Sequence, residues 1–135
     1  MNLATGSHET SVGVRLLDLD HRELATTIND LQTAVLQNQD RSLTGPLLVK
    51  LTNFSLTHFS LEEGMMSATK YPGMEAHQVH HQQMMEQLGA LVLLCKESGA
   101  ALDGQALNFL TEWHALHLEN HDLRFGHWLN DSGLL

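Results

Sequence analysis

The sequence predicts an all-α protein, an antiparallel up-down-up-down four-helix bundle with an irregular N-terminal arm. Over four long segments, apolar residues and histidines recur at steps of three and four, which is the spacing of helices that face a core. Proline occurs only 2 times in 135 residues, and short connections join the segments, which places consecutive helices side by side. The length suits a single core. We therefore expect one domain over residues 1–135, with the arm at 1–17 and the bundle at 18–129.

The first helix is expected at about residues 18–38, with Asp18 or Asp20 as its N-cap. Its core-facing stripe consists of Leu17, His21, Leu24, Ile28, Leu31 and Val35. The second helix is expected at about residues 45–69, with Pro46 close to its start. Its stripe consists of Leu47, Leu51, Phe54, His58, Leu61 or Glu62, and Met65.

The third helix is expected at about residues 74–98, after a break at 71–73 and before a stop signal at 98–99. Its stripe consists of Met74, His77, His81, Met84, Leu88, Leu91 and Cys95. The fourth helix is expected at about residues 104–129, with Asp103 as its N-cap. Its stripe consists of Leu107, Leu110, Trp113, His117, Phe125, and Trp128 or Leu129.

The composition excludes two classes of partner. The formal net charge is −9 and Lys plus Arg number only 7, which argues against nucleic acids and anionic membranes. No apolar run reaches the roughly 18 residues of a membrane-spanning helix. Cys95 is the single cysteine, which excludes an internal disulfide and fits a reducing compartment. Because the N-terminus also lacks the profile of a signal peptide, we expect a cytoplasmic protein.

Histidine is the anomaly of the composition, with 10 residues in 135. Every stripe carries a histidine near its middle, and two segments add a carboxylate: the set is His21, His58 with Glu62, His77 with His81, and His117 with Asp122. Singly, a core histidine is more often hydrogen-bonded than bound to metal. Together, five imidazoles and two carboxylates would meet in one interior, where each unpartnered polar group costs a few kcal/mol and net stability is about 5–15 kcal/mol. Metal coordination removes that cost, because neutral imidazole is a ligand and cations neutralise carboxylates.

The number and kind of donors select the metal. Seven side chains are too many for one tetrahedral zinc ion, which takes four. Nitrogen donors mixed with two carboxylates suit a pair of iron or manganese ions. The sequence contains no Glu-x-x-His motif, the usual pattern of carboxylate-rich di-iron bundles. A site rich in histidine and poor in carboxylate is better suited to reversible ligand binding than to oxygen cleavage.

Taken together, these residues resemble the hemerythrin family, and most closely its bacterial members. The matching motifs are Ser11-Val12-Gly13-Val14 ahead of Asp18-x-Asp20-His21, His58-Phe59-x-x-Glu62-Glu63, and Trp113-x-x-x-His117. The resemblance covers nearly the whole chain, and all seven ligand positions are filled at the family's spacing. Helical phasing alone would favour His121, four residues after His117, over Asp122, which lies about 140° around the axis. The family pattern favours Asp122.

The resemblance implies a non-haem di-iron centre that binds dioxygen. One iron would be held by His77, His81 and His117, and the other by only His21 and His58. Glu62 and Asp122 would bridge them together with an oxo or hydroxo group. The second iron would then be five-coordinate, and dioxygen would bind end-on at its open position. The implied pocket wall consists of Leu24, Phe59, Trp113 and Leu118.

Two positions depart from the family pattern. Gly6 stands where the arm commonly has a tryptophan, and His114 stands where a large apolar residue is common. His114 would add a polar group to the ligand pocket, or it would face outward. We expect His80 and His127 to face solvent. Asp20 and Glu63 are candidate hydrogen-bond partners of ligand N–H groups.

Three functions fit this site. Dioxygen binding would need no catalytic acid or base from the protein, so we expect no catalytic residue. The first is a dioxygen carrier or store that binds its ligand without turnover. The second is an oxygen or redox sensor, cut from a longer signalling protein with a fused output domain. The third is an enzyme that reduces peroxide or nitric oxide at the open iron. Besides dioxygen, candidate ligands are therefore nitric oxide, peroxide and azide-like anions. A zinc-bound or metal-free structural bundle is the remaining alternative.

Overall fold

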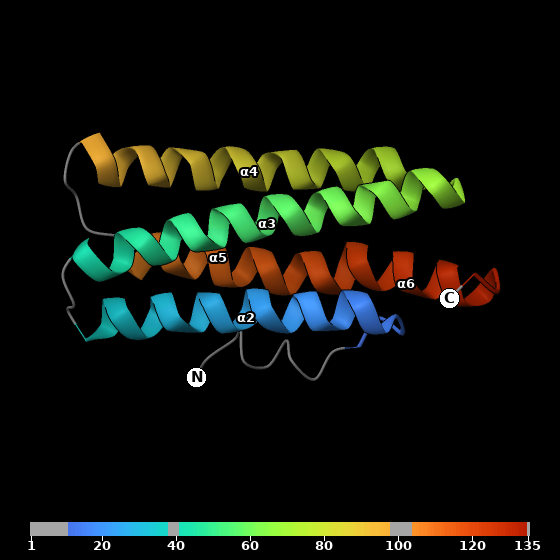
Figure 1. Cartoon of the computed structure of the whole chain (residues 1–135), viewed down its shortest axis with the longest axis horizontal. Helices are drawn as coiled ribbons and strands as arrows, with labels where there is room; N and C mark the ends of the chain where they lie inside the picture. The colour runs from blue at the N-terminus through green and yellow to red at the C-terminus, as the bar shows by residue number, and fades with distance from the viewer. Residues whose placement is uncertain (1–10, 38–40, 98–103, 135) are drawn as a thin grey trace.

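In the part of the chain that the structure describes, four helical rods lie side by side. Each runs antiparallel to the one before it (Figure 1). The computed structural model describes residues 11–37, 41–97 and 104–134, and no strand occurs within them. The rods are α2 (Arg15–Leu36), α3 (Arg41–Thr69), α4 (Met74–Glu97), and a fourth built from α5 (Gly104–His117), the π-helical segment η2 (Leu118–Asp122) and α6 (Leu123–Asp131). The predicted all-α four-helix bundle is confirmed. None of the described helices is long and apolar enough to cross a membrane.

The first helix begins at Arg15 rather than at 18, so the predicted boundary of the arm was wrong. Val14 precedes the helix in an extended conformation and offers no side-chain cap. Asp18, a predicted cap, instead lies within the helix and reaches back to the arm. Its carboxylate accepts hydrogen bonds from the Val12 N–H at 2.9 Å and from the Ser11 hydroxyl at 2.7 Å. One side chain thus anchors the end of the arm to the helix that follows.

The second helix begins at Arg41 rather than at 45, and Pro46 lies inside it. A proline at that position removes one backbone donor, and the 29-residue helix continues past the loss. Helix α4 begins at Met74 as predicted, and the fourth rod extends to Asp131 rather than to 129. Three predicted features lie outside the described residues, namely Gly6, the stop signal at 98–99 and the cap Asp103.

A polar band divides the core into two apolar clusters. The Leu24 cluster contains Leu24, Ile28, Leu31, Leu51, Phe59, Met84, Leu88 and Leu110, among others. The Phe125 cluster contains Val12, Val14, Leu17, Met66, Leu118, Phe125 and Leu129. On α2, His21 lies between Leu17 of one cluster and Leu24 of the other, and all three are buried. The same order of apolar, polar and apolar residues recurs on the other rods, so the polar side chains meet inside the bundle.

The predicted stripes lie on the inner faces of the helices with one shift on α3. Glu62, rather than Leu61, takes the inward position and is fully buried. Met66 is also fully buried, whereas Met65, which was predicted to face the core, is only half-buried. The inward face of α3 therefore follows Phe59, Glu62 and Met66 at steps of three and four.

The arm packs tightly against α6. Gly13 takes a left-handed conformation (φ 82°), and its carbonyl accepts a hydrogen bond from the Asn130 amide at 3.0 Å. A Cβ added at Gly126 would lie 1.9 Å from the Val12 carbonyl oxygen. Only glycine allows the backbones of arm and helix to approach so closely.

This contact generates a prediction. Gly126→Ala should lower the free energy of unfolding by about 1–3 kcal/mol, because the new methyl group forces the arm away from α6. Gly89→Ala is the matched control, since a Cβ there meets nothing within 4 Å. It should raise the free energy of unfolding by about 0.5–1 kcal/mol, the difference in helix propensity. Denaturant titration followed by circular dichroism measures both, and equal stabilisation by the two variants would contradict the packing.

Candidate metal centre

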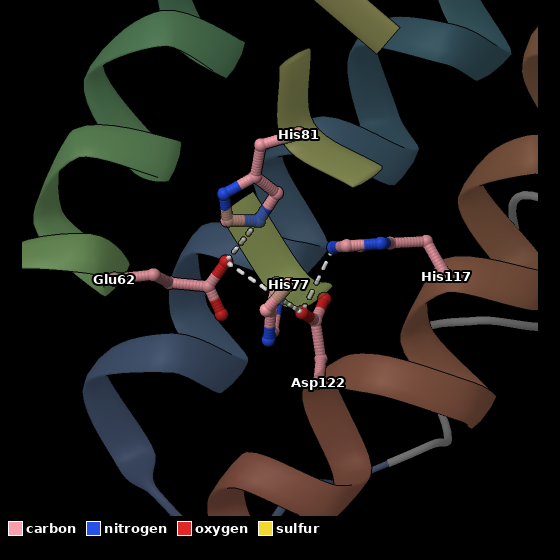
Figure 2. A group of neighbouring side chains, drawn as sticks. All are labelled: Glu62, His77, His81, His117 and Asp122. Atoms are coloured by element: carbon pink, nitrogen blue, oxygen red, sulfur yellow. Dashed lines mark ion pairs between the residues drawn. The ribbon is translucent and has the colours of Figure 1, made fainter. Parts of the chain in front are cut away.

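Seven polar side chains from all four rods meet in the band between the apolar clusters. They are His21 of α2, His58 and Glu62 of α3, His77 and His81 of α4, His117 at the end of α5, and Asp122 at the end of η2. Each is no more than 2% exposed. Figure 2 shows five of them, with the side chains of Glu62, His77, His81 and His117 pointing toward Asp122 or one another. The structure thus brings together every residue that the sequence proposed as a metal ligand.

The donor atoms form two overlapping groups, each with its members within 4.8 Å of one another. The larger group consists of Glu62, His77, His81, His117 and Asp122, and the smaller of His21, His58, Glu62 and Asp122. The two carboxylates are common to both groups. One group therefore has three imidazoles and the other has two.

Asp122 lies between the groups. Its Oδ1 is 2.9 Å from Nε2 of His77 and 3.0 Å from Nε2 of His117, whereas its Oδ2 is 3.1 Å from Nε2 of His21. Each oxygen of this carboxylate thus faces a different set of histidines. That is the arrangement of a carboxylate that can bridge two metal ions.

Glu62 faces the histidines from α3, and its shortest contacts are to His81 and His58. Its Oε1 is 3.2 Å from Nε2 of His81 and 3.3 Å from Nε2 of His58, and its Oε2 is 4.0 Å from Nε2 of His21. Glu62 therefore approaches both groups as well, although one oxygen, Oε1, makes the shorter contacts on both sides.

Outer hydrogen bonds fix the rotation of two rings. Nδ1 of His58 is 2.8 Å from Asp20 Oδ2, and Nδ1 of His81 is 2.9 Å from Glu63 Oε2. Because a carboxylate only accepts, each Nδ1 carries the proton. Nε2 of each ring then points inward, and it offers a lone pair when the imidazole is neutral. Both carboxylates were expected from the sequence to play this part.

The inward atoms are poorly satisfied by one another. Nε2 of all five histidines, both oxygens of Glu62 and Oδ1 of Asp122 are buried without a hydrogen-bond partner. With neutral rings, lone pairs of nitrogen face lone pairs of oxygen. With every ring protonated, five buried positive charges would face two negative ones. A pair of cations between the nitrogens and oxygens resolves both conflicts, so the donor set fits a metal centre.

The pKa values of two buried groups show how strongly the side chains interact. Burial alone would lower the pKa of His58, but the hydrogen bond to Asp20 and the close carboxylate of Glu62 outweigh it and raise the pKa to about 10. Burial and the charge of Asp122 would raise the pKa of Glu62, but the close imidazoles of His58 and His81 lower it to about 2. Glu62 is therefore ionised at neutral pH. Metal binding would release the extra proton of His58, because only neutral imidazole is a ligand.

The π-helical segment explains how Asp122 reaches the site. The N–H of Leu123 bonds to the carbonyl of Leu118, five residues back instead of four. The extra residue in this turn shifts the register by one, so Asp122 takes the place that His121 would take on a regular α-helix. Asp122 is accordingly buried, and His121 is only half-buried. Its ring stacks on His80 at a centroid distance of 4.2 Å.

A small enclosed cavity adjoins the seven residues. Its volume is about 10 Å³, the space of roughly one water molecule. Four proposed pocket residues line it, namely Leu24, Phe59, Trp113 and His114. Leu118 does not line it and packs in the Phe125 cluster instead. Its place in the wall of a ligand pocket therefore stays a prediction.

His114 faces inward, which the sequence left open. Its side chain is only 4% exposed, and its Nε2 is buried without a hydrogen-bond partner. Burial, reinforced by the neighbouring His21, lowers the pKa of His114 to about 3. The ring is therefore neutral, and it brings one polar edge into a cavity otherwise lined largely by apolar side chains.

His80 was expected to face solvent and does so only in part. The ring is half-buried, and its Nδ1 lies 2.7 Å from Nδ1 of His117. The sequence did hold a signal for this contact. His80 lies one helical turn from His77, so it flanks the inward face of α4 on the side of the fourth rod.

Comparison with known proteins places the chain among relatives with the same fold. The family model "Hemerythrin HHE cation binding domain" matches residues 12–129. A bacteriohemerythrin of Stenotrophomonas maltophilia is 24% identical over 122 residues, which are 90% of this chain and 78% of the relative. Myohemerythrin-1 of Phascolopsis gouldii is 30% identical over 78 residues, 58% of this chain and 60% of the relative. A wild-type hemerythrin crystal structure superposes with a TM-score of 0.83 at 22% identity, covering 90% of this chain and 92% of the other.

The choice between Asp122 and His121 can be tested directly. Asp122→Ala removes a donor from both groups. Loss of an outer hydrogen-bond partner of a ligand lowers metal affinity by roughly 10–100-fold, and loss of a shared ligand should lower it by at least as much. His121→Ala should leave the metal content unchanged. Elemental analysis after dialysis against graded chelator measures both. Retention of metal by Asp122→Ala and its loss from His121→Ala would reverse the assignment.

Proposed function

This chain belongs to the hemerythrin family, and from that membership we propose that it is a non-haem di-iron protein that binds dioxygen. The observation that carries the proposal is the sharing of two buried carboxylates between groups of three and two histidines. Unequal groups around common bridges leave one ion with fewer ligands than the other. A vacant coordination position is what a small diatomic ligand needs.

We assign the ligands as follows. His77, His81 and His117 would hold one iron, and His21 and His58 would hold the other. Glu62 and Asp122 would be shared by the two ions, since both carboxylates belong to both donor groups. Bound there, an iron pair would supply the electrons for reversible dioxygen binding, and the ion with two histidines would have room for the ligand.

The chain's own residues shape and dry the site. Phe59 is buried and stacks on His81, with centroids 4.0 Å apart and planes 9° from parallel. Leu24, Phe59 and Trp113 line the cavity beside His58. These side chains exclude bulk water, which would otherwise enter as a competing ligand. Outside the metal-binding set we assign no catalytic residue, because binding without turnover needs no acid or base from the protein.

His114 favours a second candidate within the same centre. A neutral imidazole in the cavity provides a polar partner for water or for a small anion, which an apolar wall does not. Such a group suits a redox sensor, with a fused output domain in a longer chain, or an enzyme that reduces peroxide or nitric oxide. In either case we place the protein in the bacterial cytoplasm, where its one cysteine, Cys95, would remain reduced.

Metal analysis and one mixing experiment test the main proposal. The purified protein should carry about two iron atoms per chain and, when oxidised, absorb in the near-ultraviolet with the pattern of an oxo bridge. Reduced protein mixed with air-saturated buffer in a stopped-flow instrument should give an oxygenated spectrum that reverses under argon. A single zinc ion per chain would exclude the di-iron centre. Direct conversion to the diferric form would favour the sensor or the enzyme.

Replacing His114 distinguishes the two candidates. His114→Leu removes the unpartnered polar edge from the cavity while keeping similar bulk, so oxidation of the oxygenated protein to the diferric form should slow several-fold. The time course of the oxygenated absorption band measures this rate. His127→Leu, at an exposed position of α6, is the control and should not change it. An unchanged rate in His114→Leu would remove His114 from the ligand pocket.

A further inference from the structure

Three of the five inward histidines have an outer partner at Nδ1, and that of His117 differs from the other two. His58 and His81 hydrogen-bond through Nδ1 to carboxylates, whereas Nδ1 of His117 lies 2.7 Å from Nδ1 of His80. The planes of His80 and His117 are 6° from parallel, and their centroids are 4.9 Å apart. A centroid separation so much longer than the N···N distance is that of two rings joined edge to edge by a hydrogen bond.

The proposed function determines which ring donates. If His117 binds iron through Nε2, its neutral ring must carry the proton on Nδ1. Only one proton fits between two nitrogens at this distance, so Nδ1 of His80 accepts it. His80 then carries its own proton on Nε2. This tautomer leaves His80 no lone pair for a metal of its own, and its contact with His117 is its role.

Aromatic neighbours hold the pair in this geometry. The Trp113 ring packs against both imidazoles, at 4.5 Å and 11° from His117 and at 5.2 Å and 16° from His80. His121 stacks on His80 at 4.2 Å. His80 thus has little freedom to rotate away from His117, although it comes from a different helix.

The kind of outer partner affects how strongly a ligand histidine donates electron density to its metal ion. A carboxylate that accepts the Nδ1 proton of a ligand histidine draws it outward and makes Nε2 a stronger electron donor. A neutral imidazole draws the same proton less strongly. His117 should therefore donate less electron density to its iron than His81, which contacts Glu63 on the other side of the same group. Weaker donation favours the reduced ion over the oxidised one.

We propose that His80 is a positioning residue of the metal centre, which holds His117 in the iron-binding tautomer and keeps it a weaker donor than its carboxylate-backed neighbours. This inference rests on the proposed function. Although His80 lies outside the ligand set, it would help to set the reduction potential of the iron pair.

Three substitutions at His80 separate its possible contributions. His80→Phe keeps a ring in the stack and removes the acceptor. His80→Gln keeps an acceptor on a neutral side chain, and His80→Glu supplies a carboxylate like that of Glu63. His121→Phe is the matched control, because His121 belongs to the same stack and only its ring packing is at issue.

Two measurements are made on the whole iron-loaded protein: iron retained against a chelator, and the midpoint potential from spectroelectrochemical titration. His80→Phe should weaken iron retention about tenfold, and His80→Gln should restore it. His80→Glu should lower the midpoint potential, by about 59 mV if the one-electron equilibrium shifts tenfold. His121→Phe should match the wild type. Circular dichroism before loading verifies that each variant is folded.

The outcomes distinguish this proposal from the function on which it rests. Wild-type protein without iron would overturn both. Wild-type protein with two irons, and His80 variants whose retention and potential equal those of the wild type, would overturn the role of His80 alone. An effect of His121→Phe as large as that of His80→Phe would also overturn it, because stacking rather than the hydrogen bond would then be responsible.

Discussion

The structure depends on one electrostatic constraint: unshared electron pairs from five imidazoles and two carboxylates point at one another in a space without water. Neutral rings would turn lone pairs toward the carboxylate oxygens, and five protonated rings would leave excess positive charge. Cations are what such an arrangement requires. Metal binding and stability are therefore coupled here, because the bound ions would remove an unfavourable term that folding alone cannot remove.

The remainder of the bundle holds these donors in place before any metal arrives. The two apolar clusters lie on either side of the polar band and fix the four rods without using the seven residues. Asp20 and Glu63 set the rotation of His58 and His81 from outside, and both remain partly exposed to solvent. Packing thus supplies the distances between the helices, and hydrogen bonds supply the orientation of the rings. A site built this way keeps its geometry when ligands come and go.

The helical spacing of apolar residues and histidines was enough to predict the four helices and to choose the candidate site residues. His21 could be placed because Leu17 and Leu24 flank it at helical spacing, and the same reasoning applied to the other histidines of the stripes. The first residues of the first two helices were harder to predict, because Val14 has no capping side chain and the second helix continues through Pro46. Such features depend on tertiary contacts that hydrophobic spacing does not encode.

Helical spacing could not predict two details of the site, namely the inward position of Asp122 and the contact made by His80. A regular α-helix would place His121, rather than Asp122, over His117, and the single π-helical turn reverses that order. The family resemblance suggested Asp122, but only the backbone hydrogen bonds explain it. His80 was assigned to solvent because its neighbours on α4 were considered alone, whereas its partner His117 comes from α5. Spacing along one helix cannot report a hydrogen bond between two.

The inequality of the two donor groups extends beyond the number of histidines. In the group of two, His58 has a carboxylate behind it, and in the group of three, His81 has a carboxylate while His117 has a neutral ring. Each group thus has one histidine with a carboxylate behind it, and the group of three also has a histidine whose outer partner is a neutral ring. A weakened third donor would reduce the difference in electron density between the two ions. The outer partners, which lie beyond the ligand set, therefore belong to any physical account of how this centre would bind and release its ligand.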